Sequence, residues 1–289
     1  MTTIIIPAHN ESRTIGRLLR QIVPTSPIPD LNIIVIANGC TDDTADIARS
    51  FGQSVQVISI PDASKQLALK AGDLAAASFP RIYVDADVEL GLPDIRALEA
   101  ELRRPAALAT APRRVVALDG CPWSVRRYYD VWTRLPQVRG ELFGRGAFAV
   151  SEEGHRRLAA LPPLMADDLA ASLSFSPAER SIAAGAEVTY YPPRRFADLV
   201  RRRVRAATGV AQIERTPSAP ASSQRTRLSD LVRLARDEPS LLPSLACFTM
   251  VTVLARTAAR RPIARGDYST WLRDESSRGA AAILKADKA

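Results

Sequence analysis

The chain has 289 residues, of which 46% are hydrophobic and 24% charged, a composition typical of a globular protein long enough to bury a full core. Its net charge of +8 is concentrated between residues 194 and 236, where eleven arginines stand against three acidic residues. A local basic surface indicates a polyanionic partner, either substrate phosphates, an anionic membrane or nucleic acid. We expect no nucleic acid, because aromatic residues are scarce there and no RRM, KH or zinc-finger pattern is present.

The three cysteines are far apart in the sequence and include no CxxC pair. This favours a reducing compartment and argues against a zinc site. The first residues lead directly into an apolar β-branched run instead of a basic segment followed by a long apolar stretch. We therefore expect no signal peptide and a cytoplasmic protein.

Strand and helix patterns alternate four times within the first 87 residues. Short apolar runs predict strands, apolar positions spaced by three and four residues predict helices, and Asn10 is a suitable N-cap for the first helix. The expected strands are 2–6, 33–36, 55–60 and 81–85, and the expected helices are 11–23, one that runs through Ile47 and Phe51, and 65–78. This alternation predicts an α/β fold with a mostly parallel sheet and helices on both faces.

Polar residues follow three of these strands. They are Asn10 and Glu11 after the first strand, Asn38 after the second, and Asp85 and Asp87 after the fourth. Ligands bind parallel sheets at the carboxyl ends of the strands. Side chains alternate along an extended backbone, so the two aspartates can point the same way and share a divalent cation such as Mg²⁺; otherwise they are two solvated acids at a strand end. No GxGxxG or GxxxxGK[ST] pattern is present, which argues against a dinucleotide fold and a P-loop.

Four blocks together resemble the GT-A glycosyltransferases of family 2: residues 6–11, residues 38–44, Lys65 with Ala71-Gly72, and residues 84–87. The resemblance implies a GT-A catalytic domain at 1–215, with a nucleotide-binding half at about 1–90 and an acceptor half at about 91–215. It implies inverting transfer of a sugar from a nucleotide-diphosphate donor with Mg²⁺ or Mn²⁺. By this resemblance the nucleoside pocket would be lined by Pro7, Ala8, Asn10, Glu11 and Asn38, with Lys65 near the donor and Asp85 and Asp87 on the ribose and metal. Asn38 stands where the family often has aspartate, so the resemblance does not decide which nucleotide the donor carries.

Beyond residue 87 the alternation loosens. Helices are expected at 94–103 and 123–138, with one or two strands within 106–117. Residues 140–150 form a glycine-rich loop that leads into a strand. This loop is either an ordinary turn or the counterpart of the segment that precedes the acceptor site in the family.

Asp167 and Asp168 form a second acidic site before a helix that includes Leu173. Acidic residues at a helix N-terminus commonly just complement the helix dipole. In the family, an acidic pair at this place supplies the general base, which would be Asp168, with Asp167 as its neighbour.

A strand at 188–191 and a basic helix at 194–205 follow. Arg201, Arg202 and Arg205 are candidates to meet the donor diphosphate or a phosphorylated acceptor, or they form a solvated basic face. The helix lacks the Gln-x-x-Arg-Trp motif of processive members of the family, which argues against a processive synthase.

The C-terminal part is expected to be a linker at 216–226 followed by a helical extension at 227–289, with helices at 227–236, 240–261 and 268–277. The apolar run 241–255 is short and rather polar for a spanning helix, which needs roughly 17–25 apolar residues. It is either a buried helix or, because arginines flank it, an interfacial helix at the cytoplasmic face of a membrane. The acceptor is expected to be a small molecule or a lipid-linked one, and the interfacial helix suits the lipid-linked acceptor.

Two other classes of function compete with the glycosyltransferase. One is a non-catalytic nucleotide-sugar-binding protein on the same fold, which would not need an acid at position 168. The other is a nucleotidyltransferase, for which a glycine- and arginine-rich first loop is expected, and residues 7–11 do not provide it.

Overall fold

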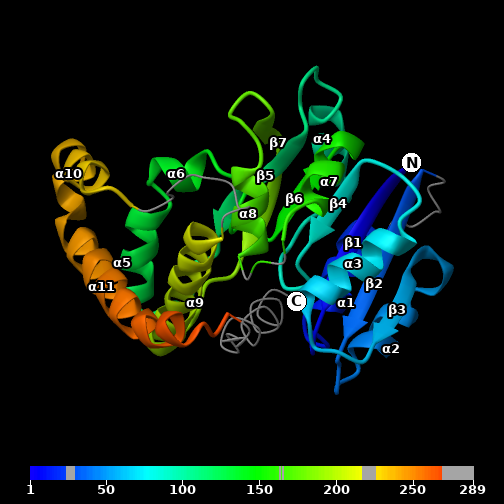
Figure 1. Ribbon diagram of the computed structural model, residues 1–289, viewed down its shortest axis with the longest axis horizontal. Helices are drawn as coiled ribbons and strands as arrows, with labels where there is room; N and C mark the ends of the chain where they lie inside the picture. Colours follow the sequence, from blue (N-terminus) through cyan, green and yellow to red (C-terminus); the bar gives the residue numbers. More distant parts are fainter. Residues whose placement is uncertain (24–29, 163, 165, 217–225, 269–289) are drawn as a thin grey trace.

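The computed structural model describes residues 1–23, 30–162, 164, 166–216 and 226–268, and a seven-stranded sheet forms its centre (Figure 1). The strands are β1 (Thr2–Ala8), β2 (Leu31–Asn38), β3 (Gln56–Ile60), β4 (Arg81–Val84), β5 (Ala109–Val116), β6 (Ala147–Val150) and β7 (Arg180–Tyr190). Their order in the sheet is β3-β2-β1-β4-β6-β5-β7. Six strands run parallel, and β6 is antiparallel to both of its neighbours, β4 and β5. The predicted mostly parallel sheet is confirmed.

Helices cover both faces of this sheet, as predicted, because alternate residues of its central strands feed two separate cores. The helices are α1 (Ile15–Ile22), α2 (Thr44–Arg49), α3 (Lys65–Ala75), α4 (Leu92–Glu101), α5 (Trp123–Trp132), α6 (Pro136–Arg139), α7 (Glu152–Ala159), α8 (Asp167–Leu173), α9 (Phe196–Arg215), α10 (Leu228–Asp237) and α11 (Leu242–Arg265). Ile4 and Ile6 pack with Leu18 of α1 and Ile95 of α4, whereas Ile5 packs with Ala68 of α3. Both faces of β1 are therefore buried, which explains its unbroken apolar run.

The first helix begins later than the sequence indicated. α1 starts at Ile15 instead of Glu11, and its N-cap position is Thr14 instead of Asn10. Asn10 lies in the preceding loop with a φ of 51°, a left-handed conformation that asparagine tolerates better than most residues. The prediction of Asn10 as N-cap was wrong, because contacts with the distant loop after β2 fix this segment outside the helix.

Two other elements differ from their predicted bounds. The helix expected at 123–138 divides into α5 and α6, and Pro136 stands at the start of α6, where a proline has no intrahelical bond to lose. β7 begins at Arg180, eight residues before the expected strand, and pairs in parallel with β5. Helix α7 had not been predicted.

Helices α5, α9, α10 and α11 lie together beyond the β5–β7 edge of the sheet (Figure 1). Tyr128 of α5 stacks on Phe248 of α11 with ring centroids 5.1 Å apart, and Val204 of α9 packs against Ala255 and Ala259 of α11. Helix α11 thus shares buried cores with α5 and α9. Most of the expected linker at 216–226 and of the helix at 268–277 lies outside the described residues, and the domain division stays a prediction.

Candidate active site

Three polar loops meet at one edge of the sheet. β2, β1 and β4 are neighbours and run in the same direction, so their carboxyl ends lie side by side. The loops that follow them carry Asn10 and Glu11, the residues after Asn38, and Asp85 with Asp87. The convergence predicted from the strand order is present.

The loops after β1 and β2 are bound tightly to each other. The buried Asn38 donates from Nδ2 to the Ala8 carbonyl at 2.9 Å, and Asn10 Oδ1 accepts from the Thr41 amide at 2.7 Å. The Glu11 amide donates to Thr44 Oγ1 at 2.7 Å. The Asn38 amide group therefore faces the backbone of its own wall, and the loops form a rigid surface.

Cys40 joins the same wall, and the sequence had not singled it out. Its Sγ donates to the Ala8 carbonyl at 3.3 Å and accepts from the Asn10 amide at 3.4 Å. Only the place of Cys40 in the Asn-Gly-Cys-Thr turn could have indicated this contact.

A small open cleft lies beside this wall and brings together residues from distant parts of the chain. Its lining includes Pro7, Lys65, Asp85 and Asp168, four of the predicted site residues. Lys65, the first residue of α3, places Nζ 3.0 Å from Oδ1 of Asp85. A cation, the first carboxylate of the Asp-x-Asp motif and the proposed base thus share one cavity.

Residues 140–146 form a loop that connects Asp85 with Asp168. The Gly144 amide donates to Asp168 Oδ2 at 2.7 Å, and the Gly146 carbonyl accepts from the Asp85 amide at 2.7 Å. Both glycines have positive φ, 63° and 73°, which disfavours any residue with a Cβ. The segment is therefore more than an ordinary turn, because it contacts both Asp85 and Asp168.

Two arginines that the sequence did not reveal as site residues hold this loop. Arg114 of β5 donates to the carbonyls of Phe143 and Gly144 at 2.7 and 2.8 Å and lies 4.4 Å from the ring centroid of Trp132. Burial, and then the charge of Arg145, lower the pKa of Arg114 to about 9. Burial likewise lowers the pKa of Arg145 to about 10. Gly-Arg-Gly at 144–146 was a usable signal for Arg145, but nothing in the sequence marked Arg114.

Arg202 packs over a buried ring. Its guanidinium is 4.5 Å from the centroid of Tyr190. Burial raises the pKa of Tyr190 well above its usual value; the charge of Arg202 opposes this rise and the charge of Asp87 adds to it. The charges of the predicted donor arginine and of the second carboxylate of the Asp-x-Asp motif therefore both act on Tyr190.

The other members of the predicted set are placed less centrally. Arg201 is half-exposed and pairs with Asp198 at 3.0 Å, which favours the solvated alternative for this arginine. Arg205 is half-buried on α9. Asp167 opens α8, and its side chain lies outside what the structure describes.

The residues at the end of β4 fit a cation that is shared with a substrate. Across the described part of the chain, no three His, Cys, Asp or Glu residues gather into a metal-binding group. Asp85 and Asp87 supply two carboxylates, and Mg²⁺ is commonly held by one or two carboxylates together with substrate phosphates. A closed metal cage made by the protein alone does not fit.

Solved structures share this architecture. A mannosyltransferase from Pyrobaculum calidifontis, solved with GDP-Man and Mn²⁺, aligns with a TM-score of 0.60 and 19% identity over 99% of this chain and 79% of its own. TarS 1–349 of Staphylococcus aureus, solved with UDP-GlcNAc, aligns with a TM-score of 0.51 and 11% identity over 93% of each chain. These likenesses define the fold as that of the GT-A glycosyltransferases.

The particular family follows from the sequence match. Residues 3–148 match the family model for glycosyl transferase family 2, so the chain belongs to that family and is a glycosyltransferase. An uncharacterised glycosyltransferase of Mycobacterium tuberculosis is 35% identical over 124 residues, 43% of this chain and 54% of its own. The 4,4'-diaponeurosporenoate glycosyltransferase of Staphylococcus aureus is 41% identical over 90 residues, 30% of this chain and 24% of its own. The matches thus span about half and about a quarter of these relatives.

Proposed function

We propose that the chain transfers a sugar, with inversion, from a nucleoside-diphosphate sugar to an acceptor hydroxyl. The observation that carries the proposal is the single cleft lined by Lys65, Asp85 and Asp168. Inverting transfer needs a group that binds the leaving diphosphate and a carboxylate that accepts the proton of the acceptor. One cleft offers both.

The donor would lie against the wall formed by the first two loops. Pro7, Ala8, Asn10, Glu11 and Asn38 belong to this wall and would border the nucleoside. Lys65, Arg202 and Arg205 would supply positive charge to the diphosphate, and Asp85 would bind the ribose. This assignment is supported by the position of the wall beside the cleft that contains Pro7 and Asp85.

Asp87 and Asp85 would hold Mg²⁺ or Mn²⁺. The bound cation would neutralise charge on the departing diphosphate. The Pyrobaculum mannosyltransferase was solved with Mn²⁺, and the two carboxylates at the end of β4 provide ligands of the type that such a cation prefers.

Asp168 would act as the general base, with Asp167 as the alternative. Two backbone amides, Gly144 and Leu169, donate to its two oxygens at 2.7 and 2.8 Å. These bonds fix the direction of the carboxylate within the cleft.

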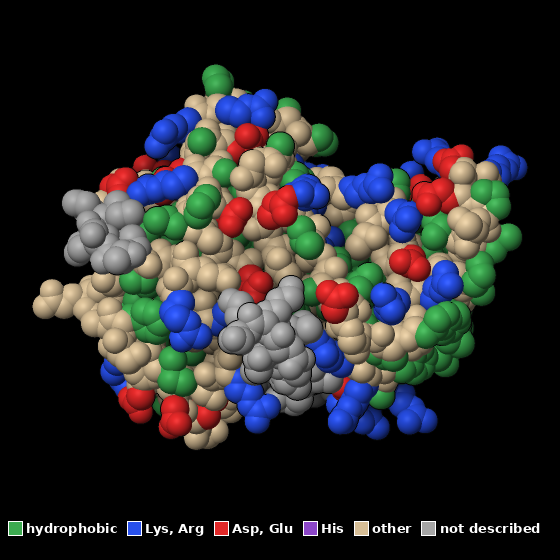
Figure 2. All heavy atoms as spheres, turned by 180° about the vertical axis from the view of Figure 1, so that it is seen from behind, with side chains coloured by type: hydrophobic (Ala, Val, Ile, Leu, Met, Phe, Trp, Pro, Cys, Tyr) green, Lys and Arg blue, Asp and Glu red, His purple; other side chains and the backbone are tan. Residues whose placement is uncertain are grey.

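The C-terminal helix α11 bears on the acceptor and on where the enzyme works. The segment Pro239–Arg265 is long and apolar enough to cross a membrane, contrary to the expectation from the shorter apolar run, but a core helix packed on one side passes the same test. Met250, Val253 and Leu254 of α11 are exposed, and hydrophobic side chains gather on the outer side of the arm formed by α10 and α11 (Figure 2). We propose a cytoplasmic enzyme that contacts an anionic membrane peripherally and uses a lipid-linked acceptor.

Asp168→Asn tests the central proposal. The donor is first identified by thermal shift with UDP, GDP, dTDP and CDP in Mn²⁺, and transfer is then measured as nucleoside diphosphate release in the presence of a membrane extract. General-base assistance is worth about 10²–10⁴-fold, so we expect a loss of that order with unchanged donor affinity. Asp167→Asn is the matched control. Activity of Asp168→Asn within a few-fold of the unsubstituted protein would move the role to Asp167 or elsewhere.

A further inference from the structure

The loop 140–146 is bound to helix α8 at two points. Gly144 donates to Asp168, and the Leu142 amide donates to Ser172 Oγ at 2.9 Å. Asp168 and Ser172 are four residues apart on α8 and therefore lie on the same face of the helix. The loop thus follows one face of the short helix that carries the proposed base.

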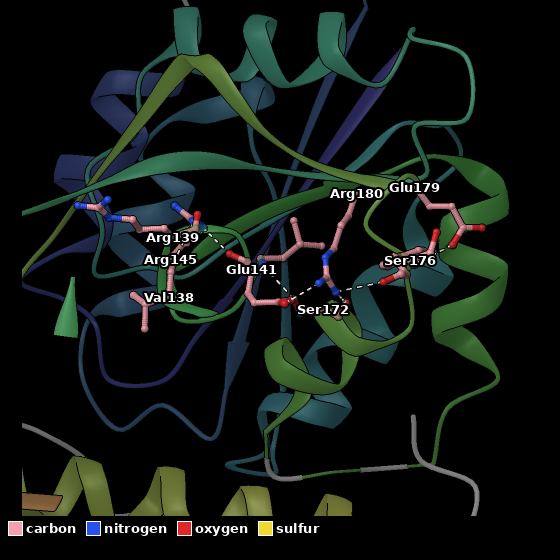
Figure 3. A network of polar contacts seen from close by, with 10 residues as sticks. Val138, Arg139, Glu141, Arg145, Ser172, Ser176, Glu179 and Arg180 are labelled. Carbon is pink, nitrogen blue, oxygen red and sulfur yellow. Dashed lines mark hydrogen bonds and ion pairs between the residues drawn. The ribbon is translucent and has the colours of Figure 1, made fainter. Parts of the chain in front are cut away.

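The second of these points is secured by a buried ion pair. Ser172 Oγ donates to Glu141 Oε2 at 2.6 Å, and Arg180 Nη2 donates to Glu141 Oε1 at 2.5 Å (Figure 3). Arg180 Nη1 also donates to the carbonyls of Ser172 and Phe175 at 2.5 and 3.1 Å, at the C-terminal end of α8. The side chains of Arg180 and Glu141 are only 13% and 10% exposed. We call Glu141, Ser172 and Arg180 the clamp.

Neighbouring arginines hold the remainder of the loop. Arg145, 3% exposed, donates to the carbonyls of Glu141, Pro112, Val138 and Arg139 at distances between 2.8 and 3.3 Å. Arg114 donates to the Gly144 carbonyl, and the Gly144 amide donates to Asp168. Each end of the loop is therefore attached to a rigid part of the fold.

A clamp of this kind is poorly explained by stability. A buried ion pair is often no better than well-packed apolar residues, because removing two charges from water offsets their attraction. Proton transfer, in contrast, requires the base within hydrogen-bond reach of the acceptor, and misplacement by about 1 Å can cost 10²-fold in rate. The clamp binds the loop and the helix that hold Asp168, and these two elements determine the position of its carboxylate.

We propose that Glu141, Ser172 and Arg180 are positioning residues that fix Asp168 for proton transfer. This inference rests on the proposed role of Asp168. The clamp touches the helix and loop on either side of that carboxylate and belongs neither to the wall of the first two loops nor to the Asp-x-Asp motif. Its loss should change turnover and leave donor affinity intact.

Ser172→Ala and Glu141→Gln test the proposal, with Ser244→Ala as the matched control. Ser244 is another fully buried serine, bonded to Asp130 on the α5–α11 interface. Turnover at saturating donor, donor Kd and Tm are measured for each variant. For the two clamp variants we expect turnover to fall by about 10- to 100-fold with donor Kd unchanged. Ser244→Ala should keep turnover even where its Tm falls by the same amount.

Two results would overturn the proposal. One is turnover in both clamp variants equal to that of Ser244→Ala. The other is a parallel loss of Tm, donor binding and turnover in both variants, which would make the clamp a purely structural feature. A wrong assignment of Asp168 as the general base would be recognised separately, because Asp168→Asn would then keep its turnover.

Discussion

Gly146 offers a direct test of how closely the loop 140–146 must pack against the Asp-x-Asp motif. Its φ is +73°, and a Cβ added there would lie 2.4 Å from Cγ1 of Val88. Val88 is 1% exposed and has a short branched side chain that cannot swing aside. The Gly146 carbonyl also accepts from the Asp85 amide at 2.7 Å, so any shift of this peptide moves the first carboxylate of the motif.

The magnitude for Gly146→Ala follows from two additive costs. A left-handed backbone costs a non-glycine residue about 1–2 kcal/mol. Forcing a methyl group against a well-packed side chain costs about 1–3 kcal/mol more. The free energy of unfolding should therefore fall by about 2–5 kcal/mol. Gly52→Ala is the control, because Gly52 has a similar φ of +66° with nothing within 4 Å of its added Cβ, so it should show the first cost alone.

Urea unfolding of both variants separates the two costs, and calorimetric titration with Mn²⁺ and the donor nucleotide measures the effect on the site. We expect Gly146→Ala to lose more stability than Gly52→Ala and to bind nucleotide more weakly, whereas Gly52→Ala keeps its affinity. Equal losses of stability in both variants, or unchanged nucleotide binding in Gly146→Ala, would refute the close packing of this loop on Asp85.

Three further predictions concern the metal, the partly buried His155 and the C-terminal helix. EDTA should weaken nucleotide binding strongly, and Asp87→Ala should abolish this sensitivity; tight binding in EDTA would contradict the metal assignment. Burial lowers the pKa of His155 below its usual value of 6.5, with the charge of Asp73 opposing and that of Arg81 assisting, so the unfolded chain binds the proton more readily. Stability should therefore fall as pH drops below about 6.5, and His155→Gln should flatten that slope in urea titrations across this range. The full chain should co-sediment with anionic vesicles at low salt, and Met250→Asp with Val253→Asp should prevent it; equal sedimentation with and without the substitutions would exclude this face.

Much of the fold of residues 1–90 could be predicted because its signals are local. The apolar run of β1 is typical of a central strand buried on both faces, and Asp85 and Asp87 directly follow β4. Once the alternation of strand and helix is recognised, parallel neighbours place their carboxyl ends at one edge. The cleft residues Lys65 and Asp85 followed from that reasoning and from the family resemblance.

The remaining features depend on contacts between distant residues. The start of α1 is set by the bond between Thr41 and Asn10, which no local pattern indicates. The four residues of β6 have no periodicity that reveals their direction, so its antiparallel insertion could not be predicted. Arg114 sits in an unremarkable strand sequence and acquires its place only through the loop that it meets. The division between α5 and α6, in contrast, was indicated by Pro136 and could have been predicted.

The antiparallel strand β6 also bears on how the enzyme can move. Its pairing with β4 joins Arg81 to Val150 and Tyr83 to Phe148, and its pairing with β5 continues the same sheet to β5 and β7. A hinge between the strands before and after β6 would have to break these ladders, whereas enzymes that close by rotation bend at a few loop residues. The loops after β4 and the helices beyond β7 are therefore attached to one continuous sheet. Substrate capture in this protein should proceed through loop movements, with little change in the overall dimensions of the molecule in solution.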